Sequence, residues 1–221
     1  MRPRLNRPSS VRGVMDLMSL AAAALFLALE AASAQVQEGN QYLSFEDRFS
    51  ADFPNAPTVR ESTYTTELGI ILPTRVHMAE DDFGKYSVTV VDWRNSEELY
   101  EPFLAGCQDC DGAMPNDIRG AALHAAFGFV SRGGEVTYLG QMDTEEVQGV
   151  RIHLLNKDGS RTYGTTHWHE YRLYIIEATA PPSAPPPHFF PVSIGFIDEE
   201  GRRVRYVERY SPLFPTPVRV R

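Results

Sequence analysis

Alternating apolar and polar positions predict that most of this chain forms β-strands. The clearest case is KYSVTVVDW, residues 85–93, whose side chains divide between two faces, with Tyr86, Val88 and Val90 on one and Val91 and Trp93 on the other. Looser patterns of the same kind predict strands within residues 42–54, 58–68, 70–80, 135–147 and 149–182. A sheet is therefore expected to be the main element of the fold.

Two segments in the middle of the chain have helical spacing instead. Residues 96–105 start with Ser96 as a cap and place acidic residues in the first turn. Residues 116–134 carry an apolar stripe, begin with Asn116 or Asp117 as a cap, and end in two glycines. Both segments are predicted to be helices.

Turn-forming residues divide the later strands. Lys157-Asp158-Gly159-Ser160 predicts a hairpin, and Glu199-Glu200-Gly201 predicts a second turn. The loop at residues 180–191 holds six prolines and is expected to be extended or irregular. Such a loop either binds a partner or is a covered connection whose Phe189 and Phe190 pack into the core. The whole pattern predicts a single α+β domain, with a central antiparallel sheet flanked by one to three helices.

The N-terminus has the layout of a secretory signal peptide. Four arginines precede the apolar run LMSLAAAALFLAL, residues 17–29, and the small residues Ala32-Ser33-Ala34 follow it. A bilayer-spanning helix needs about 20 apolar residues, so the run is short for a span, although a retained anchor is the alternative. We therefore expect residues 1–34 to be a signal peptide, residues 35–221 to be the domain with no remaining transmembrane span, and the location to be periplasmic or secreted.

The charge of the chain argues against nucleic acid as a partner. The formal net charge is −8, and it becomes −10 when residues 1–34, with four arginines and two acids, are removed. An acidic protein gains nothing from the release of counterions by DNA or RNA. The remaining partner classes are an envelope protein and a small ligand.

The sequence GCQDCDGAMP, residues 106–115, contains both cysteines of the chain. Outside the cytosol a disulfide between Cys107 and Cys110 is the default, and it would close the loop between the two predicted helices. A redox couple requires a stabilised thiolate, which the neighbouring Asp109 and Asp111 disfavour. A zinc site would need two more ligands. These three interpretations remain open, with the structural disulfide favoured.

Three histidines form a candidate site for zinc or another divalent metal. If residues 166–174 are a strand, His167 and His169 project from the same face. A hairpin centred near residues 157–161 brings His153 opposite about residue 165, close to His167. Three imidazoles would leave an open coordination position, as catalytic metal sites do. The alternative is a sheet face on which the histidines supply hydrogen bonds.

Several arginines near the C-terminus form a candidate anion site. Arg203, Arg205 and Arg209 would share one face of a strand and could bind a carboxylate or a phosphate. The alternative is ordinary ion pairing with neighbouring glutamates, which is common on protein surfaces.

Several stretches together resemble a known group of proteins. FSADFPNAPTV, GKYSVTVVDW, YRLYIIEATAPP and SIGFIDEEGRRVRY occur here in the order typical of a family of exported proteobacterial proteins similar to the PsbP-like α/β/α sandwich group. The resemblance implies a central antiparallel sheet flanked by helices and a non-catalytic role in binding or in assisting an assembly. It implies no active-site residues.

The sequence favours a periplasmic, non-enzymatic module that binds a protein or a small ligand and needs no cofactor. The motifs G-x-S-x-G, G-x-G-x-x-G, H-E-x-x-H and the Walker loop do not occur in it. The alternative functions are a metal-binding protein or metalloenzyme that uses the strand histidines, and a thiol–disulfide protein that uses Cys107 and Cys110.

Overall fold

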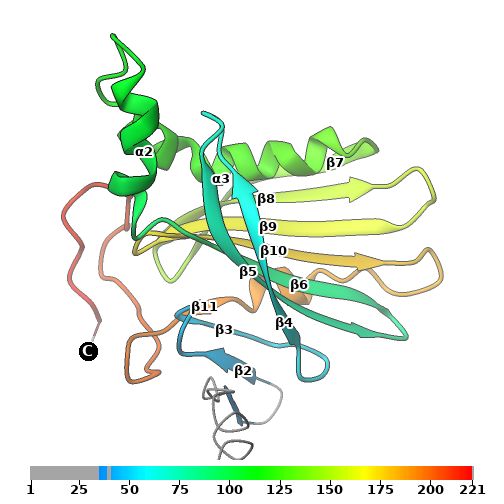
Figure 1. Cartoon of the computed structure of the whole chain (residues 1–221). Helices are drawn as coiled ribbons and strands as arrows, with labels where there is room; N and C mark the ends of the chain where they lie inside the picture. The colour runs from blue at the N-terminus through cyan, green and yellow to red at the C-terminus, as the bar shows by residue number, and fades with distance from the viewer. Residues whose placement is uncertain (1–34, 39–40, 221) are drawn as a thin grey trace, which may run out of the picture. The chain divides into compact units, whose positions relative to one another are not determined.

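The computed structural model describes residues 35–38 and 41–220, so the predicted signal peptide lies outside the described residues. The described chain belongs to one compact unit, Ala34–Arg221. It is an α+β fold dominated by antiparallel sheets, as predicted (Figure 1). Among the described residues, no helix has both the length and the apolar character needed to cross a bilayer.

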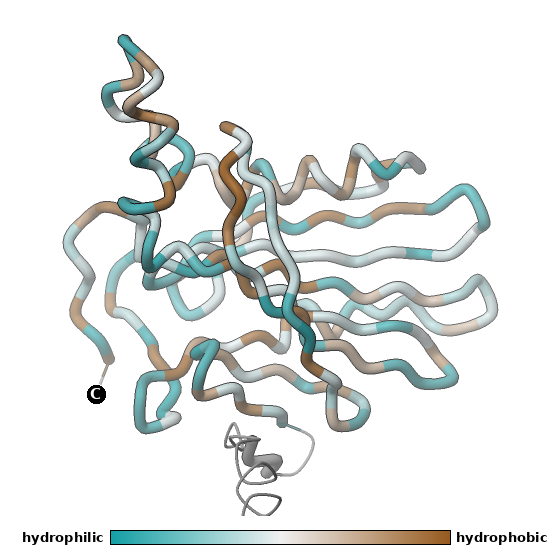
Figure 2. The backbone as a smooth tube through the Cα atoms, viewed as in Figure 1, coloured by the Kyte–Doolittle hydropathy of each residue, from teal (hydrophilic) through white to brown (hydrophobic). Residues whose placement is uncertain are grey.

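The main sheet has seven strands in the order β4-β5-β6-β10-β9-β8-β7, and every neighbouring pair is antiparallel. The strands are β4 (Thr58–Thr65), β5 (Ile71–Asp81), β6 (Gly84–Asp92), β7 (Glu135–Thr144), β8 (Val147–Leu155), β9 (Arg161–His169) and β10 (Arg172–Ala180). In Figure 2 hydrophobic stretches follow β5 and β8, whereas the turn between β8 and β9 is hydrophilic.

Three successive hairpins join β7 to β10. The predicted one at residues 157–160 is confirmed, with Gly159 at a φ of 81°. The other two turns contradict the prediction of a continuous strand over residues 135–147 and of a strand running through residues 166–174. Glu145 and Glu146 form one turn, and Glu170 and Tyr171 form the other, all with φ between 45° and 67°. Non-glycine residues seldom adopt this left-handed conformation, which explains why both turns were missed.

Helices cover one face of the main sheet. The predicted helix over residues 96–105 is confirmed as α2 (Ser96–Ala105), although its N-cap is Asn95 and not Ser96. Helix α3 (Ala113–Ser131) begins three residues before the prediction. Its N-cap is Gly112, with a φ of 83°, rather than Asn116 or Asp117. Helix α3 packs on β8, β9 and β10. The fully buried Phe129 ring lies over Gly164 of β9, where a Cβ would come within 2.7 Å of it.

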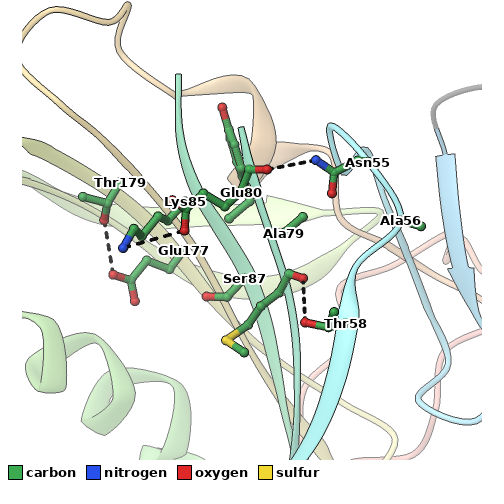
Figure 3. Close-up of a pocket in the computed structure, with 11 residues that line it drawn as sticks. Asn55, Ala56, Thr58, Ala79, Glu80, Lys85, Ser87, Glu177 and Thr179 are labelled. Atoms are coloured by element: carbon green, nitrogen blue, oxygen red, sulfur yellow. Dashed lines mark hydrogen bonds and ion pairs between the residues drawn. The ribbon is translucent and has the colours of Figure 1, made fainter. Parts of the chain in front are cut away.

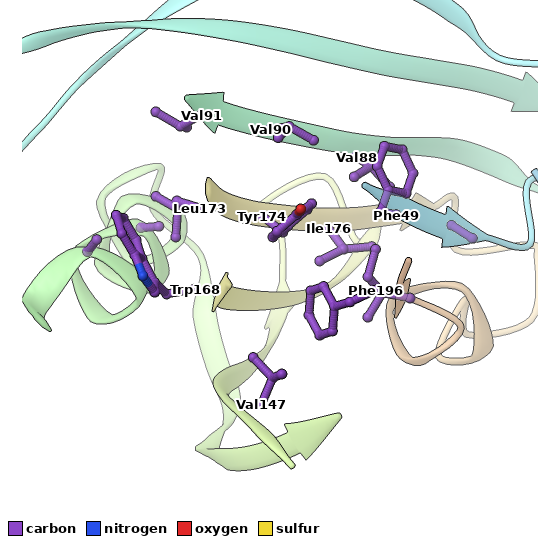
Figure 4. Close-up of a cluster of buried hydrophobic side chains, with 14 of the residues drawn as sticks. Phe49, Val88, Val90, Val91, Val147, Trp168, Leu173, Tyr174, Ile176 and Phe196 are labelled. Atoms are coloured by element: carbon purple, nitrogen blue, oxygen red, sulfur yellow. The ribbon is translucent and has the colours of Figure 1, made fainter. Parts of the chain in front are cut away.

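A second, smaller sheet covers the opposite face. Its strands are β1 (Gln35–Glu38), β2 (Gln41–Ser44), β3 (Phe49–Ala51) and β11 (Gly195–Phe196). Phe49 and Phe196 of this sheet pack against Tyr174 of β10 with ring centroids 6.3 and 5.2 Å away (Figure 4). The short helix α4 (Phe189–Val192) also contacts β9 and β10. The hydrophobic core therefore lies on both faces of the main sheet.

Candidate functional site

His167 and His169 are buried at the end of β9, beneath the C-terminal segment (residues 197–220). Both side chains are 0 % exposed. Nε2 of His169 lies 2.7 Å from the Tyr206 hydroxyl, and the Phe196 ring packs 4.5 Å from the imidazole of His169. Burial lowers the pKa of His167 to about 4, and burial together with nearby arginines lowers the pKa of His169 to about 3. Both imidazoles are therefore neutral at physiological pH.

The structure does not bring His153 to this pair. The predicted register is wrong by two residues, because His153 pairs with Tyr163 whereas Gly149 pairs with His167. Four residues along a strand correspond to about 13 Å, while zinc binds imidazole nitrogens at about 2 Å. Within the described ranges, no group of three histidine, cysteine or acidic side chains is placed to hold a metal ion.

His153 belongs instead to a row of neighbouring rings, tilted against one another, on the same face of the sheet. We call Tyr138, His153, Tyr163, His188 and Phe189 the aromatic row. Successive ring centroids in this row are 5.0, 4.0, 6.2 and 4.3 Å apart. Cross-strand ring pairs of this kind stabilise sheets. The row runs from β7 to the proline-rich loop and ends at Phe189, which is 76 % exposed.

The two cysteines form the expected disulfide between the two long helices. The Cα atoms of Cys107 and Cys110 are 5.6 Å apart, and the bond lies between the end of α2 and the start of α3. The carbonyl oxygen of Cys110 accepts a hydrogen bond from the Ala113 N–H at 2.9 Å, where α3 begins. The disulfide therefore helps to fix the connection between the helices.

The arginines of the candidate anion site are already engaged in ion pairs. Arg203 and Arg205 share the carboxylate of Glu145, at 2.8 and 2.9 Å, and Arg209 pairs with Asp143 at 2.9 Å. These acids lie at the β7–β8 turn and not among the glutamates near the arginines in sequence. The contacts attach the C-terminal segment to the end of the main sheet.

A buried polar network that the sequence did not indicate links the two sheets. His77 Nε2 lies 2.7 Å from Asp47 Oδ2, and its Nδ1 lies 3.0 Å from the Tyr42 hydroxyl. The order hydroxyl, imidazole, carboxylate is that of a nucleophile and its base. However, burial and then the Asp47 charge raise the pKa of Tyr42 to about 12, which opposes activation of the hydroxyl. The network is suited to joining β2 to β5 rather than to catalysis.

One pocket lies on the helix-covered side of the main sheet (Figure 3). This sheet-face pocket has a volume of about 660 Å³ and is lined by Asn55, Ala56, Thr58, residues 78–80, residues 85–87, Glu177 and Thr179. Its polar groups bind one another: Lys85 pairs with Glu80 at 3.7 Å, and Asn55 donates to the Glu80 carbonyl at 2.9 Å. Glu177 in this lining also has a partner, since Arg132 donates to its carboxylate at 2.8 Å.

A second pocket lies between the proline-rich loop and the β5–β6 turn. This proline-loop pocket has a volume of about 390 Å³ and is lined by Asp52, Pro54, Phe83, Tyr86, residues 185–187, Phe189 and Phe190. The sequence left two interpretations of the loop, a covered connection and a binding surface, and each fits one phenylalanine. Phe190 is 5 % exposed and packs on Tyr86, as in a covered connection, whereas Phe189 is 76 % exposed, as on a binding surface. The loop thus has both a core contact and an exposed aromatic surface.

Hydrogen bonds hold both walls of the proline-loop pocket. The Asp81 carboxylate accepts from the backbone N–H groups of Phe83 and Gly84, both at 2.9 Å, which fixes the β5–β6 turn. Arg161 donates to the carbonyl oxygens of Pro181, Pro182 and Ala184 within the loop. A site with ordered walls binds without the entropy loss of ordering them.

The proline-loop pocket has the size and composition of a small-molecule site. Pockets of about 300–1,000 Å³ that are mainly apolar, with a few polar groups, are typical of ligand binding. The sequence indicated its proline wall but not Phe83, which is 59 % exposed at a hairpin turn. Comparison of the chain with protein-family models and with curated protein sequences finds no match, so the site is defined by its own geometry.

Proposed function

We propose that this chain is a periplasmic, non-enzymatic module that binds a small ligand in the proline-loop pocket. The observation that carries the proposal is the exposure of Phe189 and Phe83, 76 % and 59 %, on the walls of an ordered apolar pocket. Clustered exposed apolar side chains on a soluble protein typically mark binding surfaces. A ligand that covers these rings gains the free energy of removing them from water.

The chemistry of the pocket favours binding over catalysis. The described residues that line it supply one carboxylate, Asp52, and one phenol, Tyr86, and no imidazole or thiol. Burial raises the pKa of Tyr86 further above its usual value, as does the nearby Asp81. A phenol in this state is a poor base and a poor nucleophile.

The proposed location rests on the sequence. A basic segment, a short apolar run and small residues before position 35 support export, and the resemblance to the exported PsbP-like group supports a role in binding or in assisting an envelope assembly. Within this proposal, the pocket is where the module acts.

Binding of a neutral apolar dye tests the proposal. Nile red should show a saturable rise in fluorescence with the full chain. Burying a phenylalanine side chain contributes about 1.5–3 kcal/mol, so Phe189→Ala should weaken binding about tenfold or more. The matched control is Phe127→Ala, which removes a 53 % exposed ring from α3. Equal binding by both variants, or no saturable binding by the native chain, would contradict the proposal.

A further inference from the structure

Two acidic side chains belong to the walls of the proline-loop pocket. Asp52 is the charged group in its described lining, and Asp81 lies in the turn that carries Phe83. The nearest lysine in sequence, Lys85, lines the sheet-face pocket and pairs there with Glu80. Arg161 is committed to the carbonyl oxygens of the loop. The pocket therefore presents a negative charge that the described residues of its own lining do not neutralise.

Aromatic rings add to this preference. Phe83, Tyr86, Phe189 and Phe190 line the pocket together with Asp52. The face of an aromatic ring carries partial negative charge, so it attracts a cation that lies above it. Quaternary ammonium groups suit such rings because they are large, weakly hydrated and apolar at the surface. An anion would be repelled by the Asp52 carboxylate, and a neutral apolar ligand would gain nothing from its charge.

We propose that the proline-loop pocket binds a free alkylammonium cation, with the ammonium group among the four rings and opposite the Asp52 carboxylate. This inference rests on the proposed function and specifies its ligand class. The volume of about 390 Å³ is larger than one trimethylammonium group needs, so the pocket has room for the rest of a small molecule.

Two ligands of the same shape, one charged and one neutral, show how much of the binding depends on the charge. Choline and 3,3-dimethyl-1-butanol differ in that a carbon atom replaces the charged nitrogen. In calorimetric titrations of the full chain, choline should bind at least about fivefold more tightly than the neutral alcohol. Asp52→Asn should abolish most of this difference, because it removes the charge but keeps the backbone N–H that donates to Ser193 at 3.0 Å.

Two further variants keep the test interpretable. Phe189→Ala should weaken choline binding about tenfold, and the control Phe127→Ala should leave it unchanged; both side chains are exposed, so both variants should fold. Equal binding of choline and the neutral alcohol would overturn the cation proposal while leaving the pocket as a binding site. The cation proposal would also be overturned, and the pocket kept as a binding site, if choline did not bind while Nile red bound the native chain more tightly than Phe189→Ala. Failure of both assays would remove the proposed function as well.

Discussion

Lowering the pH from 8 to 5 is expected to destabilise the fold by about 4 kcal/mol through His167 and His169. In the unfolded chain each imidazole binds a proton below its usual pKa of 6.5. In the folded chain the pKa values are about 4 and about 3. The unfolded state therefore binds more protons, so stability is full above about pH 7 and falls as the pH drops through this window.

The size of this loss of stability follows from the pH range between the unfolded and folded pKa values of each histidine. Each pH unit between the two pKa values costs about 1.4 kcal/mol per histidine, so the fall from pH 6.5 to 5 costs about 2 kcal/mol for each one. The surroundings reinforce this cost: Arg172 and Arg219 also disfavour a charge on His169. Acidic groups oppose this effect only in part: Glu170 Oε1 lies 3.9 Å from Nε2 of His169 and Asp143 raises the pKa of His167, yet burial still lowers both pKa values.

Urea unfolding at several pH values tests the effect. His167→Leu should remove about half of the pH dependence between pH 6.5 and 5, because it replaces a buried titratable group with an apolar one of similar size. His124→Gln is the matched control, since His124 is partly exposed on α3. Full stability of the native chain at pH 5, or an unchanged slope in His167→Leu, would refute the reasoning.

Three further predictions concern stability. Phe129→Ala should lower the free energy of unfolding by about 3–5 kcal/mol, while Phe127→Ala changes it by less than about 0.5, in urea titrations. Tyr100→Phe should cost about 1–3 kcal/mol, because the buried Asp117 loses a hydrogen bond of 2.6 Å; an unchanged unfolding midpoint would contradict this. Reducing the disulfide should cost about 2 kcal/mol or less, because it closes a short loop; thermal unfolding with and without dithiothreitol measures this.

The elements that the sequence predicted well are those with local signals. Helix α2 has acidic residues in its first turn, and the hairpin at residues 157–160 has a glycine where the backbone is left-handed. Strand β6 alternates clearly enough to show which side chains face each layer. In each case the residues that determine the local structure lie within a few positions of one another in the sequence.

The two turns that were not predicted, at residues 145–146 and 170–171, depend on a residue far along the chain. The backbone N–H of Tyr210 donates to the Glu146 carbonyl at 2.8 Å, and its hydroxyl accepts from the Glu170 N–H at 3.0 Å. One tyrosine of the C-terminal segment therefore holds both left-handed turns. The missed β7–β8 turn also explains why the partners of the arginines were not foreseen, since Glu145 lies in it. The histidine register has another cause: the β8–β9 pairs centre on residue 158, one residue before the centre of the predicted hairpin, and this moves His153 from residue 165 to Tyr163.

The contact between Phe129 and Gly164 also has an evolutionary consequence. These positions are 35 residues apart in sequence, yet the ring of one occupies the space that a side chain on the other would need. A larger residue at 164 is compatible with this packing only when 129 becomes smaller. Among any relatives of this chain, the two positions should change together, and this pair would identify the same helix–sheet packing where overall similarity has been lost.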